Sequence, residues 1–174
     1  MTRLASPVKL IAAILYQDEE PFQEALRSLE ERFSRTDYRS APVSFEGTRY
    51  YESEMGSGLL RVLLSFENLV DPVFLVPAKL AARDIEDDSR QEGKRRVNID
   101  MGYLDHHKMV LASFKERGNK VYLERGVWAD MTLFFRKGSV DPLPWSFPDF
   151  KAGLYDRALL DIRRVYQEQM RSLR

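Results

Sequence analysis

The chain of 174 residues contains no cysteine. Disulfides, a thiolate nucleophile and cysteine-bound metals are therefore excluded, and the composition suits a reducing compartment. A membrane-spanning run is missing as well: the N-terminal apolar stretch PVKLIAAILYQ contains Lys9 and ends at the acidic letters DEE, so it is too short for a bilayer. No small-residue cleavage pattern follows a basic start. We therefore expect a cytoplasmic protein with no membrane partner.

Several motifs with known chemistry are also missing. The chain has no G-x-x-x-x-G-K-[ST], which argues against a P-loop GTPase. It has no G-x-S-x-G and no H-E-x-x-H, the marks of two hydrolase classes. The RNP pattern of RNA-binding sheets is absent too. The sequence therefore selects no reaction and predicts no cofactor.

The residues that are present describe an ordinary globular protein. Hydrophobic residues make up 44% and aromatic residues 11%, enough for a core, and the length fits one domain over residues 1–174. The formal net charge is zero, but residues 1–92 carry 11 Lys and Arg against 17 Asp and Glu, whereas residues 93–138 carry 10 against 5. This basic segment can attract an anion, or it can pair with the acidic segment inside the fold.

Apolar periodicity predicts a βαββαβ order. The predicted strands cover residues 8–16, 37–45, 60–66 and 97–101. One helix follows Asp18, and a second begins with a turn at Asp71-Pro72 and frays into EDDSRQEGK. This α+β order resembles the ferredoxin-like arrangement, in which two helices cover one side of a four-stranded antiparallel sheet.

The rest of the chain extends this predicted core. We expect a helix near 105–116, then a β-hairpin in KVYLERGVWADMTLFFRKG that turns near Arg125-Gly126. A proline-rich bridge, VDPLPWSFPD, leads to a C-terminal helix from about Phe150. The apolar stripe of that helix consists of Tyr155, Leu159, Ile162 and Tyr166.

Five blocks along the chain carry a family resemblance: PVKLIAAILYQDEE, YYESEMGSGLLRVLLSFENLVDP, GKRRVNIDMGYL, VYLERGVWADMTLFF and PLPWSFPDF. With these blocks in order, the chain resembles the bacterial and archaeal domain-of-unknown-function family DUF4416. The resemblance covers nearly the whole chain and implies no activity. Where the family pattern reads N-I-D-P-G-Y, this chain has Met101 in place of the proline, so the turn expected after the fourth strand is less constrained.

Alternating polar residues on two predicted strands form the candidate site. If their polar faces meet, they line a cleft for a small anionic or nucleotide-like ligand, with Arg95 or Arg96 holding an oxyanion and Trp128 or Tyr103 stacking. If the faces look into water, the same residues make weak surface ion pairs. The candidate ligand-binding residues are Arg95, Arg96, Asn98, Asp100, Tyr103, Trp128, Asp130 and Thr132.

Other groupings are weaker. His106 and His107 beside Asp105 bring metal-ligand types together, but neighbours on a helix point about 100° apart, so no metal site is predicted. Tyr50 and Tyr51 either border a pocket or pack over the sheet. Two further functions remain open: an RNA- or protein-interaction module that uses an open sheet face, and an enzyme in the same cleft with Asp100 or Asp130 as a general base.

Overall fold

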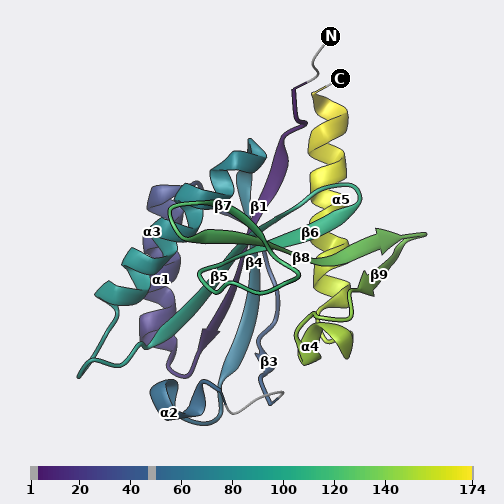
Figure 1. The fold of residues 1–174 in the computed structure, drawn as a ribbon. Helices are drawn as coiled ribbons and strands as arrows, with labels where there is room; N and C mark the ends of the chain where they lie inside the picture. The colour runs from purple at the N-terminus through teal and green to yellow at the C-terminus, as the bar shows by residue number, and fades with distance from the viewer. Residues whose placement is uncertain (1–3, 47–49, 174) are drawn as a thin grey trace.

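The computed structural model describes residues 4–46 and 50–173. Within them helices alternate with strands up to Leu104, after which come four more strands and two helices (Figure 1). The strands are β1 (Val8–Tyr16), β2 (Thr36–Arg39), β3 (Val43–Ser44), β4 (Leu60–Val70), β5 (Val97–Leu104), β6 (Lys108–Ser113), β7 (Val121–Glu124), β8 (Val127–Arg136) and β9 (Ser139–Pro142). The helices are α1 (Glu19–Arg32), α2 (Glu52–Met55), α3 (Leu75–Asp88), α4 (Pro148–Lys151) and α5 (Asp156–Ser172), with a 3-10 turn at Pro72–Phe74.

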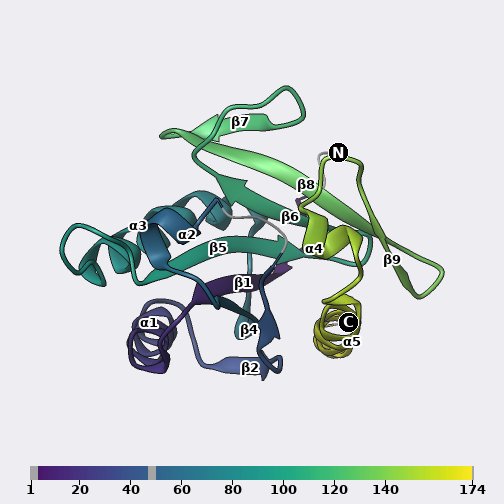
Figure 2. The ribbon, with the colours of Figure 1, turned by 90° about the horizontal axis from the view of Figure 1, so that it is seen from below.

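The strands form one antiparallel sheet. Their order is β2-β4-β1-β5-β6-β8-β7, with β3 added to β4 and β9 added to β8. Figure 2 shows the sheet curling along this order, with β7 and β8 at the opposite end from β2. The fold is therefore a mixed α and β architecture built on a large open sheet.

Both faces of the central strands are covered. Every residue of β1 is buried, as expected of a strand with apolar side chains on both faces. Leu10, Ala12 and Ile14 pack with residues of α1 and α3, whereas Ile11 and Ala13 pack with residues of α5. Figure 2 shows α1 and α3 on one side of the sheet and α4 and α5 on the other.

Most predicted elements are present. The predicted strands at 8–16, 60–66 and 97–101, the two predicted helices and the hairpin at Arg125-Gly126 are found, the hairpin with both turn residues at positive φ. The strand predicted over 37–45 is instead divided into β2 and β3, with Pro42 in the break between them. The stripe of the C-terminal helix is buried as expected. That helix begins at Asp156 rather than at about Phe150, because the chain first makes the separate short helix α4. No helix in the described ranges is long and apolar enough to cross a membrane.

Two local predictions are wrong. Residues 105–116 do not form a helix, because β6 occupies Lys108–Ser113 with Met109 and Leu111 on one face and Val110 and Ala112 on the other. Such a short run, apolar on both faces, fits a buried strand as well as a helix. The turn expected after Met101 is also wrong, because β5 continues to Leu104 and Met101 is buried in the core.

The pairing between β5 and β6 is short for two strands inside the sheet. Their register joins only three residues of β5, Gly102 to Leu104, with Leu111 to Met109 of β6. Residues 97–101 of β5 pair with β1 on one side and have no ladder to β6 on the other. We call this opening between the first half of β5 and the end of β6 the β5–β6 split.

Candidate functional site

Charged side chains of α3 occupy the edge of β5 that the β5–β6 split leaves without a strand. The backbone N–H of Ile99 donates to Glu86 Oε1 at 2.5 Å, and the Ile99 carbonyl accepts from Lys79 Nζ at 2.9 Å. Buried backbone groups require such partners. Lys79 and Glu86 are themselves buried, so the split is lined by charge and not by apolar packing alone.

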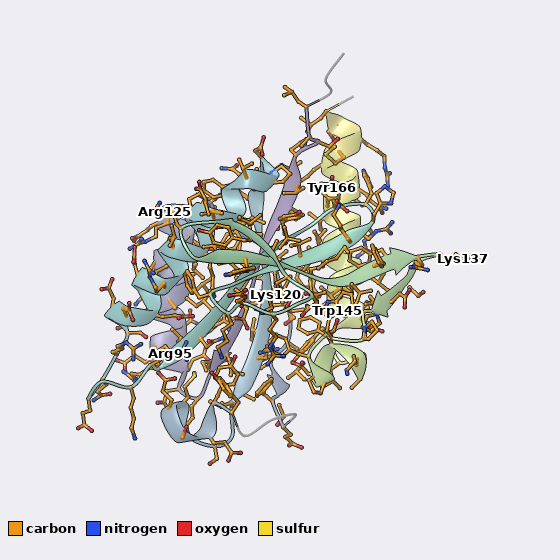
Figure 3. All side chains as sticks on the ribbon, viewed as in Figure 1. Arg95, Lys120, Arg125, Lys137, Trp145 and Tyr166 are labelled. Carbon is orange, nitrogen blue, oxygen red and sulfur yellow. The ribbon has the colours of Figure 1, made fainter. Side chains whose placement is uncertain are left out.

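Arg95 closes one side of the split. Its guanidinium donates to Glu54 at 2.7 and 2.9 Å, to Glu86 at 3.3 Å and to Asn98 Oδ1 at 3.0 Å. The hydrogen bonds that Arg95 donates to Glu54 raise the pKa of Arg95 above its ordinary value. Figure 3 places Arg95 beside the chain that leads into β5, next to α2.

Arg61 of β4 lies on the other side of β1 and is only 1% exposed. Its Nη1 donates to Asp149 of α4 at 2.6 Å, and its Nη2 lies 3.7 Å from Asp100 of β5. The guanidinium stands over the Phe45 ring, 4.5 Å from its centroid, a geometry that favours a cation. Tyr155 completes the arrangement by donating to Asp149 at 2.8 Å.

These contacts join into one group, the buried charge network. Asp100 links its two halves, because it lies 3.7 Å from Arg61 and 4.0 Å from Lys79. Burial raises the pKa of Glu86, although Lys79 and the Ile99 amide oppose that shift. Three cations face three carboxylates, so the network is neutral before Glu54 at its margin is counted. Its members are Arg61, Lys79, Glu86, Arg95, Asp100 and Asp149.

Two donors of this region have no hydrogen-bond acceptor among the described residues: Arg61 Nε and Asn98 Nδ2. Both residues lie directly opposite Leu15 of β1, one on each side, so their side chains share one face of the sheet. Asn98 is 5% exposed. A third such atom, the hydroxyl of Tyr16, belongs to the other face, where that ring stacks on Phe22.

A second polar group lies beyond the split, in the loop that follows β6. We call residues 114–120 the cationic loop. Lys120 donates to Ser113 at 2.8 Å and lies 3.6 Å from Asp130, which also accepts from Asn119 at 3.0 Å. Burial lowers the pKa of Lys120 and raises the pKa of Asp130.

The cationic loop is tied to the segment before α2. Lys115 donates to the Tyr50 hydroxyl and stands over the same ring, 4.1 Å from its centroid. Tyr50 in turn contacts Tyr51 edge to face, with centroids 5.0 Å apart. Burial, then the charge of Asp100, raises the pKa of Tyr51, which places Tyr51 in the electrostatic field of the buried charge network.

The predicted site residues fall into groups. Arg95, Asn98 and Asp100 lie together in or beside the buried charge network. Arg96 instead faces the start of α1, with its guanidinium 3.6 Å from Asp18 and 3.8 Å from Glu20. Tyr103 packs with the apolar residues between α3, β6 and β8.

The predicted residues of β8 lie nearer the cationic loop. Trp128 is opposite Ser113 and contacts the Tyr122 ring, with centroids 5.1 Å apart. Asp130 pairs with Lys120. Thr132 is buried, and its carbonyl accepts from Ser146.

Four network members were missed by reading the sequence: Arg61, Lys79, Glu86 and Asp149. Two of them carry a signal, because Arg61 interrupts the apolar run LLRVLL and Lys79 interrupts VPAKLAA. A charge placed inside an apolar run is buried with partners more often than its type alone implies. Glu86 carries no such signal, since it lies among acidic residues, and Asp149 stands in the proline-rich bridge, where no strand or helix period is readable.

The described residues offer no metal group as an alternative to this site, and two hollows, one of them lined by His106, Gln167, Met170 and Arg171, lie away from it. The described residues contain no cluster of three or more His, Cys, Asp or Glu side chains placed to hold a metal ion. A hollow of about 330 Å³, lined by Phe33, Phe66, Phe74 and Arg32 among others, lies at the other end of β4 near Val70. None of the unpartnered buried side-chain atoms of the described residues lines it.

Comparison with known proteins identifies a family and no characterised relative. The family described as a domain of unknown function, DUF4416, matches residues 6–166. No curated protein and no solved structure gives a significant match.

Proposed function

We propose that this chain, which belongs to the DUF4416 family, binds a small anionic or nucleotide-like ligand at the buried charge network, on the face of the sheet that Arg61 and Asn98 share. One observation carries the proposal: two buried side-chain donors, Arg61 Nε and Asn98 Nδ2, share a face of the sheet and lack an acceptor among the described residues. Buried N–H groups without acceptors are rare in native proteins, and each costs about 1–3 kcal/mol. A ligand with carboxylate, phosphate or carbonyl oxygens would satisfy both.

The charge of the site limits the class of ligand. The buried charge network is neutral, so it can orient a ligand but offers little net attraction. Net positive charge comes from the cationic loop, which contains Lys115, Arg117 and Lys120. The charges of Arg117 and Lys115 contribute to lowering the pKa of Lys120. Burial is the larger cause of that shift. This balance supports a ligand of low charge, such as a monophosphate or carboxylate, over a triphosphate.

The arrangement of strands supports the ferredoxin-like core as part of the proposal. The order β2-β4-β1-β5, together with α1 and α3 on one face, follows the antiparallel βαββαβ pattern. We extend this core by β6 to β9 and by α4 and α5, and treat residues 1–174 as one cytoplasmic domain. Such folds host many functions, so the assignment rests on the site.

The first test is a thermal-shift panel on the intact chain. Nucleoside monophosphates, sugar phosphates and small carboxylates are each added in excess, because a ligand that binds only the folded state raises the melting temperature. We expect a shift of several degrees for one class, lost in Asn98→Ala and in Arg61→Lys. The matched controls Asn68→Ala and Arg157→Lys alter exposed residues and keep the shift. A panel with no shift at millimolar ligand contradicts the proposal.

A nucleic-acid function is the second candidate, because one specific observation favours it. Tyr122 is exposed, contacts Trp128 on β8, and lies on a hairpin that follows the cationic loop. Exposed aromatic rings beside cations are the means by which sheets bind single strands. Fluorescence anisotropy with single-stranded RNA at two salt concentrations decides the matter: salt-sensitive binding lost in Tyr122→Ala favours this candidate.

An enzymatic function would use the same residues. Burial moves the pKa values of Lys120 and Asp130 toward each other, and such shifts are common in proton-transfer sites and in structural pairs alike. If substrate screening finds turnover, Asp130→Asn and Asp100→Asn are each expected to abolish it. Turnover that survives both substitutions excludes these carboxylates as the general base.

A further inference from the structure

The outermost strand of the sheet, β7, exposes apolar side chains on both of its faces. It pairs with β8 on one edge, and the other edge has no strand beside it in the part of the chain that the structure describes. Val121, Tyr122 and Leu123 are 66%, 53% and 39% exposed. A free strand edge with apolar side chains is a template for pairing with another chain.

The opposite edge of the sheet differs in a way that makes β7 unusual. At that edge β2 has the sequence TDYR and a register shift between Thr36 and Tyr38. Its Asp37 turns inward to Ser65 and Lys9. Inward charges and bulges protect an edge from pairing. β7 has a register shift of its own between Tyr122 and Glu124, but between Val121 and Leu123 there is neither a charge nor a proline, so its edge lacks the inward charge that β2 has.

We propose that β7 is a dimerisation edge, at which a second copy of this chain pairs antiparallel about Tyr122. In this register Tyr122 faces the partner's Tyr122, Val121 faces the partner's Leu123, and Lys120 faces the partner's Glu124. The segment KVYLE is therefore complementary to itself in both charge and apolar character. Directly opposite unlike charges and apolar pairs stabilise antiparallel strands.

Neighbouring registers do not have this match. A shift by one residue sets Val121 against the partner's Glu124, and a shift by two sets it against the partner's Arg125. Lys120 already donates to Ser113 at 2.8 Å and lies 3.6 Å from Asp130, so in the proposed register the partner's Glu124 shares an ammonium group that carries three donors. The pattern of the segment thus selects a single two-fold pairing.

The dimer is expected to be weak because the strand has four residues. A short edge contact falls below the area of stable complexes, so we expect dissociation constants of about 10–100 μM. The first measurement is sedimentation equilibrium of the intact chain from low micromolar to near-millimolar concentration. Monomers at every concentration would overturn the proposal.

Cysteine cross-linking tests the register, since the chain contains no cysteine of its own. Tyr122→Cys places two sulfurs opposite each other, within the reach of a disulfide. Leu123→Cys copies are diagonal to one another, about 7–8 Å apart, beyond that reach. We expect disulfide dimers from Tyr122→Cys at least tenfold faster than from Leu123→Cys or from Glu116→Cys on the exposed cationic loop.

A mixture provides the complementary result. Val121→Cys mixed with Leu123→Cys should give a 121–123 disulfide faster than either variant alone. Equal rates for all variants would mean random collision and would overturn the register.

A charge substitution links dimerisation to this edge. Glu124→Lys sets two lysines against each other and should weaken dimerisation about tenfold or more, whereas the equally exposed Glu116→Lys should not. Each variant is first checked for a native melting temperature. A dimer that survives Glu124→Lys and does not cross-link through Tyr122→Cys would lie on another surface and would overturn the proposal.

Discussion

Glu86 of α3 accepts the backbone N–H of Ile99 in β5 at 2.5 Å, at an edge of β5 that has no ladder to β6. At the β5–β6 split, a side chain of α3 therefore replaces the missing strand as the hydrogen-bond partner of β5. Charged side chains are buried at this point because α3 supplies Lys79 and Glu86 two turns apart on one face, whereas an apolar side chain could satisfy neither backbone group. The same opening brings Arg95, Asn98 and Asp100 close together.

Two glutamates should contribute to the free energy of unfolding with opposite dependence on pH. Burial raises the pKa of Glu86 above 4.5, so its folded state binds the proton more tightly than the unfolded state. Its contribution is full below pH 4.5 and is lost as pH rises through the folded value. We expect the free energy of unfolding of the wild type, minus that of Glu86→Gln, to fall as pH rises above 4.5.

Glu30 is the matched control with the opposite sign. The hydrogen bonds from the Thr36 hydroxyl, at 2.6 Å, and from its amide, at 2.8 Å, lower the pKa of Glu30. Its contribution is therefore present above 4.5 and lost as pH falls through the folded value. In urea titrations the wild type minus Glu30→Gln difference should rise as pH approaches 4.5 from below and stay level above it. Equal slopes for the two variants would contradict both assignments.

Removing Lys79 should leave the carbonyl of Ile99 unsatisfied. Lys79→Met keeps the buried stem and deletes the donor, so we expect a loss of about 1–3 kcal/mol in the free energy of unfolding. Arg83→Met is the control, because Arg83 is exposed one turn further along α3 and contacts the same Phe114 ring. It should change stability by less than about 0.5 kcal/mol. Equal losses would mean that contact with Phe114, and not the hydrogen bond, is what matters.

Breaking the buried ion pair of Arg61 and Asp149 should strongly lower the free energy of unfolding. Asp149→Ala leaves the Arg61 guanidinium buried with only the more distant Asp100, and stranding one partner of a buried pair costs about 3–5 kcal/mol. Arg157→Ala also removes an ion pair, but Arg157 is 88% exposed. That control should lose less than about 1 kcal/mol. Urea unfolding of both variants measures the difference.

The sequence predicts best those elements whose apolar pattern has a single explanation. β1 is apolar on both faces and fits only a covered strand, and α5 repeats Tyr155, Leu159, Ile162 and Tyr166 at helical spacing. β6 was missed because four consecutive buried residues satisfy a strand between two layers and a helix equally well. What decided between them was its place between α3 and α5, which depends on the completed sheet.

The candidate site was predictable only in part, for a similar reason. Asn98 and Asp100 could be selected because alternation within one strand fixes their common face. The contact between Arg61 and Asp149 joins residues 88 positions apart, and no local period reports it. Arg96 shows the converse, since its strand pattern resembles that of Asn98, yet it precedes β5 and turns to Asp18 and Glu20.

Gly102 fixes how closely β5 and β6 approach where they still pair. A Cβ at this position would lie 2.6 Å from the Val110 carbonyl oxygen and 2.7 Å from Leu111 Cδ2, and the first of these is backbone that cannot rotate away. Gly102→Ala should therefore push the two strands apart and cost about 1–3 kcal/mol. Gly118→Ala is the control, because a Cβ there meets nothing within 4 Å and its φ is not positive.

The two alanine variants distinguish a steric clash in the folded state from the effect of losing a glycine on the unfolded chain. Gly118→Ala should leave stability unchanged or raise it by about 0.4–1 kcal/mol through the unfolded state. Because the β5–β6 split begins next to Gly102, only Gly102→Ala should also speed amide exchange at Ile99 and Tyr103. If Gly102→Ala were as stable as Gly118→Ala and its amide exchange were unchanged, the prediction would be wrong. The two strands would then have room for a Cβ, and their close approach at Gly102 would not determine where the β5–β6 split begins.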